Sequence, residues 1–184
     1  MNASREVSIL KEMATELESY LLAEALFWPL RPGSDFPQLS LGMMWLTRAR
    51  LRAVASQLTS AQSADHDRAE GQLDTGLSRW AVAAETKAQK ELRTRLNLWQ
   101  AFLSEHAESP HTTAENYAQE VTHRTMAALL IHHFPRLADS PEASRLPGLD
   151  AQLRARFKVG HFVWRDELHN EFPQNEFWFL YGRV

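Results

Sequence analysis

Hydrophobic residues recur at steps of three and four along most of this chain, which is the spacing of an amphipathic α-helix. Gly71 and Gly76 weaken one part of the pattern, because glycine costs about 1 kcal/mol relative to alanine inside a helix. The third stretch below is therefore either one helix or two. The pattern predicts four long helices and a short fifth one, over residues 5–28, 39–58, 64–106, 113–134 and 149–158.

Capping and helix-breaking residues mark the expected ends of these helices. Ser4 is a suitable N-cap for the first helix, and Pro29 is expected to end it. Thr112 or Thr113 is expected to cap the fourth helix, and Gly160 is a suitable C-cap for the short one. Each of these positions predicts a boundary that a structure can test.

Helices of this length, joined by short or proline-containing loops, predict an all-α fold. We expect an antiparallel bundle with an irregular aromatic C-terminal extension, forming one helical domain over residues 1–184. Residues 1–134 would make the bundle core, and residues 135–184 would pack on it. The last 24 residues hold four Phe, two Trp and one Tyr, which is too much apolar surface to leave in water.

Composition and charge exclude several classes of function. The formal net charge is −3, so no overall field attracts nucleic acid or an anionic membrane. The absence of cysteine excludes disulfides, thiolate catalysis and cysteine-ligated zinc. The chain begins without a signal-peptide pattern and has no apolar run of about 20 residues, as a membrane span requires. We therefore expect a cytoplasmic protein without nucleic-acid or membrane partners.

Ionisable residues stand where the helical pattern calls for apolar ones. Burying a charge is costly unless it is paired, so one interpretation is a buried polar network in which Glu24 pairs with Arg95 or Arg50. In this interpretation Glu120 pairs with an arginine, and His123 stays neutral and hydrogen-bonded. The candidate network comprises Glu24, Arg50, Arg95, Glu120 and His123.

A metal site is the alternative interpretation of the same residues. Glu120 and His123 are three positions apart on one helix face, the Glu-x-x-His spacing of ferritin-like di-iron bundles, and Glu24 would be a third ligand. Iron, manganese or zinc would suit such a set. Those bundles use two such motifs, and only one faces inward here. We therefore expect neither a metal nor another cofactor.

Two further features concern possible binding surfaces. Arg48, Arg50 and Arg52 form a local basic group that we expect to be a solvated helix face. The aromatic residues of the tail either fold back on the bundle or form an interface with a partner or a second copy. The candidate interface comprises Phe172, Phe177, Trp178, Phe179 and Tyr181.

The motifs of common enzyme classes are missing from the sequence. There is no Gly-x-Ser-x-Gly, no phosphate-binding glycine loop and no His-Glu-x-x-His. We therefore predict a non-catalytic protein-interaction or structural module of helical type, with a protein partner or self-association. A metal-binding bundle enzyme is the alternative.

Overall fold

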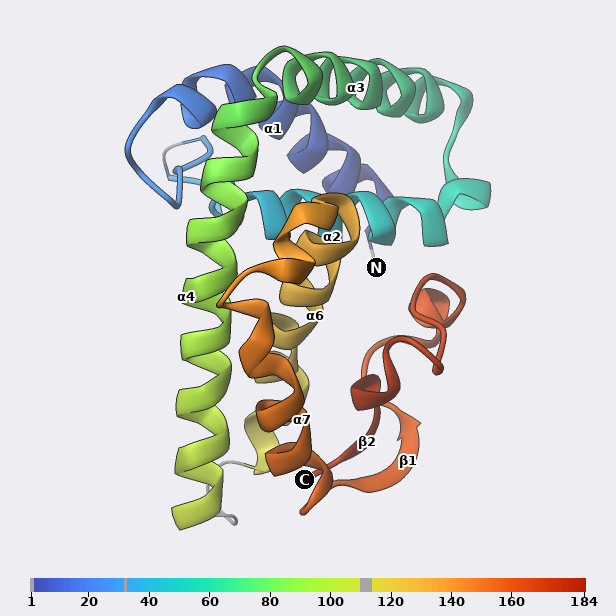
Figure 1. Ribbon diagram of the computed structural model, residues 1–184. Coiled ribbons are helices and arrows are strands. Elements are labelled where there is room, and N and C mark those ends of the chain that lie inside the picture. The colour runs from blue at the N-terminus through green and yellow to red at the C-terminus, as the bar shows by residue number, and fades with distance from the viewer. Residues whose placement is uncertain (1, 32, 110–113) are drawn as a thin grey trace. The chain divides into compact units, whose positions relative to one another are not determined.

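The computed structural model describes residues 2–31, 33–109 and 114–184. Within these residues the predicted all-α fold class is confirmed, since helices dominate and the β-structure is one two-stranded sheet (Figure 1). By its contacts the chain divides into two compact units, Met1–Glu91 and Leu92–Val184. The two units are described in turn.

The described helices are α1 (Ala3–Leu22), α2 (Leu41–Ala53), α3 (Ser60–Arg79), α4 (Ala81–Glu108), α6 (Tyr117–His133) and α7 (Leu146–Arg154). The strands are β1 (Lys158–Phe162) and β2 (Tyr181–Arg183). Short 3-10 helices lie at Ala55–Gln57, Ala114–Asn116, Pro135–Asp139, Ala143–Arg145, Asp166–Glu171 and Trp178–Leu180.

The N-terminal unit is built around α1, which packs against both α2 and α3. It approaches α3 closely at Gly76, where an added Cβ would lie only 2.8 Å from a methyl carbon of Leu17. Glycine at this position therefore lets α1 and α3 come together, although it weakens α3 itself. The core side chains of this unit include Leu10, Met13, Leu17, Met44, Leu46 and Leu73.

The first helix differs from its predicted bounds at both ends. Asn2 is its N-cap, with a side chain that accepts a hydrogen bond from the backbone N–H of Arg5. The helix ends at Leu22, well before Pro29. The reason is a long-range one: the backbones of Trp28 and Leu39 exchange two hydrogen bonds of 2.8 and 2.9 Å, which require an extended chain.

The stretch predicted over residues 64–106 is two helices, because α3 ends at Arg79 and α4 begins at Ala81. The glycines of α3 do not break it. A capping box at Thr59 and Gln62 fixes its start four residues earlier than predicted. Thr112 and Thr113, the predicted caps of the fourth helix, lie outside the described residues.

The C-terminal unit combines the second part of α4 with α6, α7 and a β-hairpin. β1 and β2 are antiparallel, with Lys158 opposite Arg183, and Val159 opposite Gly182. Gly160 lies within β1, so its predicted role as a helix C-cap is wrong; α7 has already ended at Arg154. Buried rings dominate this unit, among them Trp99, Phe102, Tyr117, Phe172 and Phe179.

Candidate functional site

Glu24 does not lie on a helix, and its side chain is exposed. The prediction that it faces the core is wrong because α1 ends two residues before it. Arg50 does lie on α2, where it is half-buried. Burial lowers the pKa of its guanidinium, while the nearby carboxylate of Glu6 acts in the opposite direction. The structure thus gives Arg50 two charged neighbours, Glu6 and Arg5, and the helical pattern singled out neither.

The structure brings Arg95, His123 and Glu120 together in the C-terminal unit. Nη1 of Arg95 lies 3.3 Å from Nδ1 of His123, and Nε2 of the same ring lies 3.8 Å from a carboxylate oxygen of Glu120. A guanidinium only donates, so Nδ1 accepts and Nε2 carries the proton. Burial, together with the positive charge of Arg95, lowers the pKa of His123 to about 4. The imidazole is therefore neutral at neutral pH.

The metal interpretation gains no support from this group. Burial and the neighbouring Glu105 raise the pKa of Glu120, so its carboxylate, the form that a metal needs, is less favourable than that of an exposed glutamate. The guanidinium of Arg95 beside His123 also repels cations. Among residues 2–31, 33–109 and 114–184, no group of three or more His, Asp or Glu side chains is arranged to hold a metal ion.

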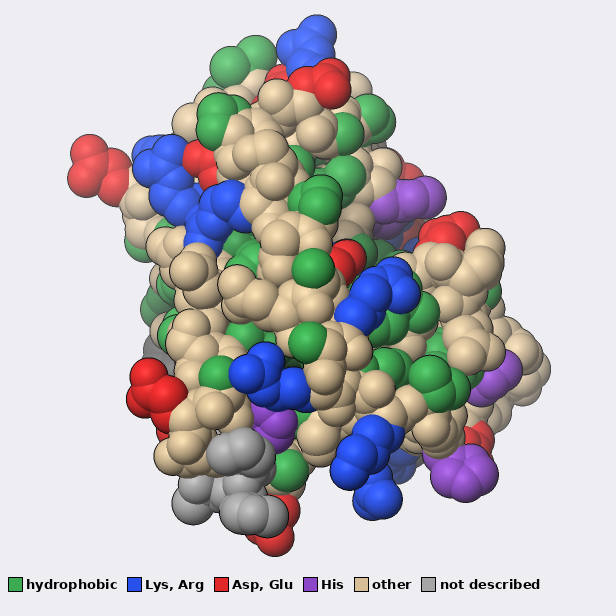
Figure 2. Space-filling model, turned by 60° about the horizontal axis from the view of Figure 1, so that its bottom comes forward, with side chains coloured by type: hydrophobic (Ala, Val, Ile, Leu, Met, Phe, Trp, Pro, Cys, Tyr) green, Lys and Arg blue, Asp and Glu red, His purple; other side chains and the backbone are tan. Residues whose placement is uncertain are grey.

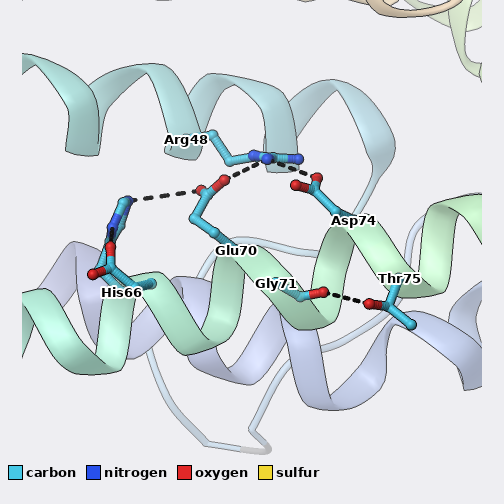
Figure 3. Close-up of polar contacts among 7 residues, drawn as sticks. Arg48, His66, Glu70, Gly71, Asp74 and Thr75 are labelled. Carbon is cyan, nitrogen blue, oxygen red and sulfur yellow. Dashed lines mark hydrogen bonds and ion pairs between the residues drawn. The ribbon is translucent and has the colours of Figure 1, made fainter.

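Arg48 is buried, so its predicted place on a solvated face is wrong. Its guanidinium binds the carboxylates of Glu70 and Asp74 on α3, the second at 2.9 Å (Figure 3). It also lies 4.3 Å from the ring centre of Trp45. Nε2 of His66 lies 3.7 Å from the Glu70 carboxylate on the other side. Glu70 and Asp74 are four positions apart and share one face of α3, which is the sequence signal that points to a basic partner.

Two more buried charges in the N-terminal unit have local structural roles. The carboxylate of Glu91 is fully buried and accepts hydrogen bonds from the Ser40 hydroxyl at 2.7 Å and the Gly42 backbone N–H at 3.0 Å. It thereby supports the N-terminus of α2, where negative charge is favoured. Lys87 donates to the carbonyl of Ala25 at 2.5 Å, and burial lowers the pKa of its ammonium.

The aromatic tail is part of the interior of its own unit. Phe172, Phe177, Phe179 and Tyr181 are buried, and Trp178 is half-buried beneath the guanidinium of Arg154. Of the two alternatives open to the tail, folding back is therefore the one observed. Four of the five candidate interface residues are thus covered within their own unit, while Trp178 stays partly exposed.

Tyrosine hydroxyls fix this tail to the rest of the unit. The hydroxyl of Tyr117 on α6 donates to the backbone carbonyl of Phe179 at 2.6 Å. Burial raises the pKa of Tyr117, so its hydroxyl keeps the proton that it donates. The hydroxyl of Tyr181 donates to the carbonyl of Phe172 at 2.7 Å. These bonds satisfy carbonyls that no regular element would satisfy.

The folded tail leaves a groove beside the hairpin, with a volume of about 500 Å³. One wall is β1 with Val163 and the facing part of β2, and the other wall is the segment 114–118 at the start of α6. The lining is mostly apolar, and Val159 stands out of β1 with 78% of its surface exposed. Sequence analysis missed this groove because residues 158–162 show no clear period.

Comparisons with known proteins give no functional information for this chain. No family model matches the chain, and neither the curated proteins nor the solved structures give a match. None of the described helices is long and apolar enough to cross a membrane. The functional argument therefore depends on the geometry of the chain itself.

Proposed function

We propose that this protein is a non-catalytic interaction module that binds an extended segment of a partner protein in the hairpin groove. The observation that carries the proposal is β1, whose residues are exposed or half-exposed along its whole length beside a mostly apolar groove. A short segment in extended conformation fits a site of this shape, because it offers both backbone groups and side chains.

The hairpin supplies the backbone half of such a contact. Its sheet has two strands among the described residues, so β1 pairs with β2 on one side and has no strand on the other. A free strand edge presents N–H and C=O groups that a further strand can pair with. The groove supplies the apolar half, with Val159 as an exposed anchor.

The occupant that we propose is a protein segment, acting without any metal or cofactor. Nucleic acid is disfavoured by the net charge of −3. A second copy of the chain is the competing occupant, because two β1 edges could pair around a two-fold axis. We place the protein in the cytoplasm, which is consistent with a chain that lacks cysteine.

A selection with phage-displayed random dodecapeptides tests this proposal. The peptides are selected on the wild-type protein and then measured against Val159→Glu and Val82→Glu. Val82 is a matched control, because it is 80% exposed on α4, close to the 78% of Val159. We expect peptides whose binding is lost with Val159→Glu and kept with Val82→Glu.

Two results would contradict the proposal. One is the recovery of no peptide whose binding depends on Val159. The other is a concentration-dependent dimer in sedimentation equilibrium that Val159→Glu dissociates, which would assign the groove to a second copy.

A further inference from the structure

We infer that the hairpin groove selects an acidic extended segment, and that Lys158 and Arg183 recognise its carboxylates. This inference rests on the proposed function, which it deepens by giving the partner segment a chemical character. The decisive feature is the position of these two cations in the hairpin, at the groove and directly opposite each other.

The register of the sheet holds two like charges together. Lys158 on β1 faces Arg183 on β2 as a cross-strand pair, and both side chains are exposed. Like charges directly opposite each other destabilise a sheet. Within the part of the chain that the structure describes, neither residue has an ion-pair partner. The hairpin thus keeps an unfavourable pair that a bound carboxylate would turn into a favourable one.

The charge of the groove differs in sign from that of the whole chain. Its described lining contains Lys158, Arg183 and His161 but only one carboxylate, Glu115, although the protein has a net charge of −3. On the face that comes forward in Figure 2, side chains of both charge signs and of histidine stand among hydrophobic ones, so the sign of the groove follows from its lining residues. A positive groove on a negative protein favours an anionic partner over a neutral or cationic one.

Gly182 allows β2 to lie very close to β1 next to the Lys158–Arg183 pair. Its φ is +157°, and an added Cβ would lie 2.3 Å from the carbonyl oxygen of Lys158 and 2.6 Å from the ring of Phe157. Only glycine lets β2 lie this near to β1 at that point. The close approach of β2 to β1 at Gly182 lies next to the position where Lys158 faces Arg183.

An extended segment can use both the free strand edge of β1 and the two cations of the groove. Successive side chains of a strand point to opposite faces. A segment that pairs with the free edge of β1 and alternates acidic with apolar residues can direct one set to the cations and the other into the groove. A small apolar acid would use the charges but not the strand edge, and the experiment distinguishes the two.

The test is fluorescence anisotropy with two labelled octapeptides. The first has the sequence Ser-Val-Glu-Val-Glu-Val-Glu-Ser, and in the second the three glutamates are replaced by lysines. We expect the acidic peptide to bind at least ten-fold more tightly than the basic one, with an affinity that falls as salt is added. Lys158→Gln and Arg183→Gln are each expected to weaken the acidic peptide about three- to ten-fold.

Arg165→Gln is the matched control, because Arg165 is also an exposed arginine of the C-terminal unit but does not line the groove. We expect it to leave the affinity for the acidic peptide unchanged. Lys158→Gln and Arg183→Gln relieve a repulsion, so their midpoints of thermal unfolding should stay equal to or rise above that of the wild type. A loss of binding therefore does not reflect a loss of fold.

The outcomes separate the failure of this inference from the failure of the proposed function. If phage-selected peptides bind through Val159 but ignore Lys158 and Arg183, the acidic preference is wrong and the interaction module stands. If decanoate binds with dependence on both cations and neither octapeptide nor any selected peptide binds, the groove is a small-acid site and both proposals fall. Equal binding of the two octapeptides overturns the inference alone.

Discussion

The two units of this chain stabilise their interiors by different means. In the N-terminal unit, buried charges stand at helix ends and between helices: Arg48 binds two carboxylates of α3, and Glu91 supports the first turn of α2. In the C-terminal unit, stacked and edge-on rings fill the interior, as with Trp99 against Phe102 and Phe172 against Phe177. This difference follows from how much of each unit's backbone lies in long helices.

Regular helices satisfy their own backbone groups except at their ends. The N-terminal unit therefore needs polar side chains only at those ends and at a few crossings. Residues 155–184 form only short strands and short 3-10 helices, so many of their backbone groups need other partners. Tyr117 and Tyr181 meet this need, because each carries a ring for the core and a hydroxyl for a carbonyl.

The C-terminal unit also contains a largely buried ion pair between Arg124 and Asp150. The guanidinium forms two hydrogen bonds of 2.9 Å to the two carboxylate oxygens and lies 4.4 Å from the ring centre of Phe179. This pair ties α6 to α7 and at the same time covers an aromatic ring of the tail. In both units a buried arginine thus joins two helices and covers an aromatic ring, as Arg124 does here and Arg48 does over Trp45 in the N-terminal unit.

Removal of a buried ring from the tail should have the largest effect. Phe172 is fully buried, so Phe172→Ala is expected to lower the free energy of unfolding by about 3 to 5 kcal/mol. Leu98→Ala is the control, because Leu98 is 42% exposed and should cost well under 1 kcal/mol. Urea unfolding followed by tryptophan fluorescence measures both. Similar losses in the two variants would show that the tail is not a packed core.

Substitution of the buried charges Glu91 and Arg48 in the N-terminal unit should have the next largest effects on stability. The loss should be greater for Glu91 than for Arg48. Glu91→Ala leaves the Ser40 hydroxyl and the Gly42 N–H buried without their acceptor, at a cost of about 2 to 4 kcal/mol. Arg48→Met should cost less, about 1 to 2 kcal/mol, because the side chains of Glu70 and Asp74 are 22% and 63% exposed and regain water. Urea unfolding of both variants tests this order, and the reverse order would contradict it.

Sequence reasoning reached the helices but not all their ends. Periodicity predicted the helices that bury a stripe of apolar residues, but it left open whether residues 64–106 form one helix or two, because α3 buries only Ala69 and Leu73. It could not show that Trp28 pairs with Leu39, since that contact is long-range, and so it extended the first helix past Glu24 and placed that residue inside. Glu24 is therefore not part of the candidate network.

The candidate site was predictable only where one helix or one contact defined it. Glu120 and His123 were found as a pair because they share one face of one helix, and Arg95 does lie beside His123. Arg48 was misplaced because its partners belong to another helix, and a polar residue without a visible partner is assigned to solvent by default. The hairpin groove has no periodic signal at all, since its walls come from segments far apart in the chain.

The pH dependence of stability distinguishes the polar group of Arg95, Glu120 and His123 from the aromatic core of the C-terminal unit. The pKa of His123 falls from an ordinary value of 6.5 to about 4 in the folded state, so the unfolded chain binds a proton more readily. Stability is therefore complete above about pH 6.5 and is lost as the pH falls toward 4, by about 1 to 3 kcal/mol. The raised pKa of Glu120 acts in the opposite direction and reduces the loss.

His123→Gln provides the comparison for this titration, because glutamine does not titrate. Urea unfolding at pH 7.5 and pH 5 should show a smaller loss of stability for His123→Gln than for the wild type. The control His132→Gln changes an exposed histidine of the same helix and should keep the full loss. Equal pH dependence of wild type and His123→Gln would show that the imidazole is not neutral and buried as described.

The smallest expected effect concerns the tyrosine hydroxyls. Tyr117→Phe and Tyr181→Phe keep the rings but leave the carbonyls of Phe179 and Phe172 without their donors, which should lower the free energy of unfolding by about 1 kcal/mol each. Tyr117→Phe should cost the more of the two, because its ring is 2% exposed and water cannot replace the hydroxyl, whereas Tyr181 is 6% exposed. Urea unfolding resolves differences of this size when the two variants share one slope. If neither variant loses stability, ring packing alone holds the tail. The two units would then differ in using apolar or charged contacts, and not in how their backbone hydrogen-bonding groups find partners.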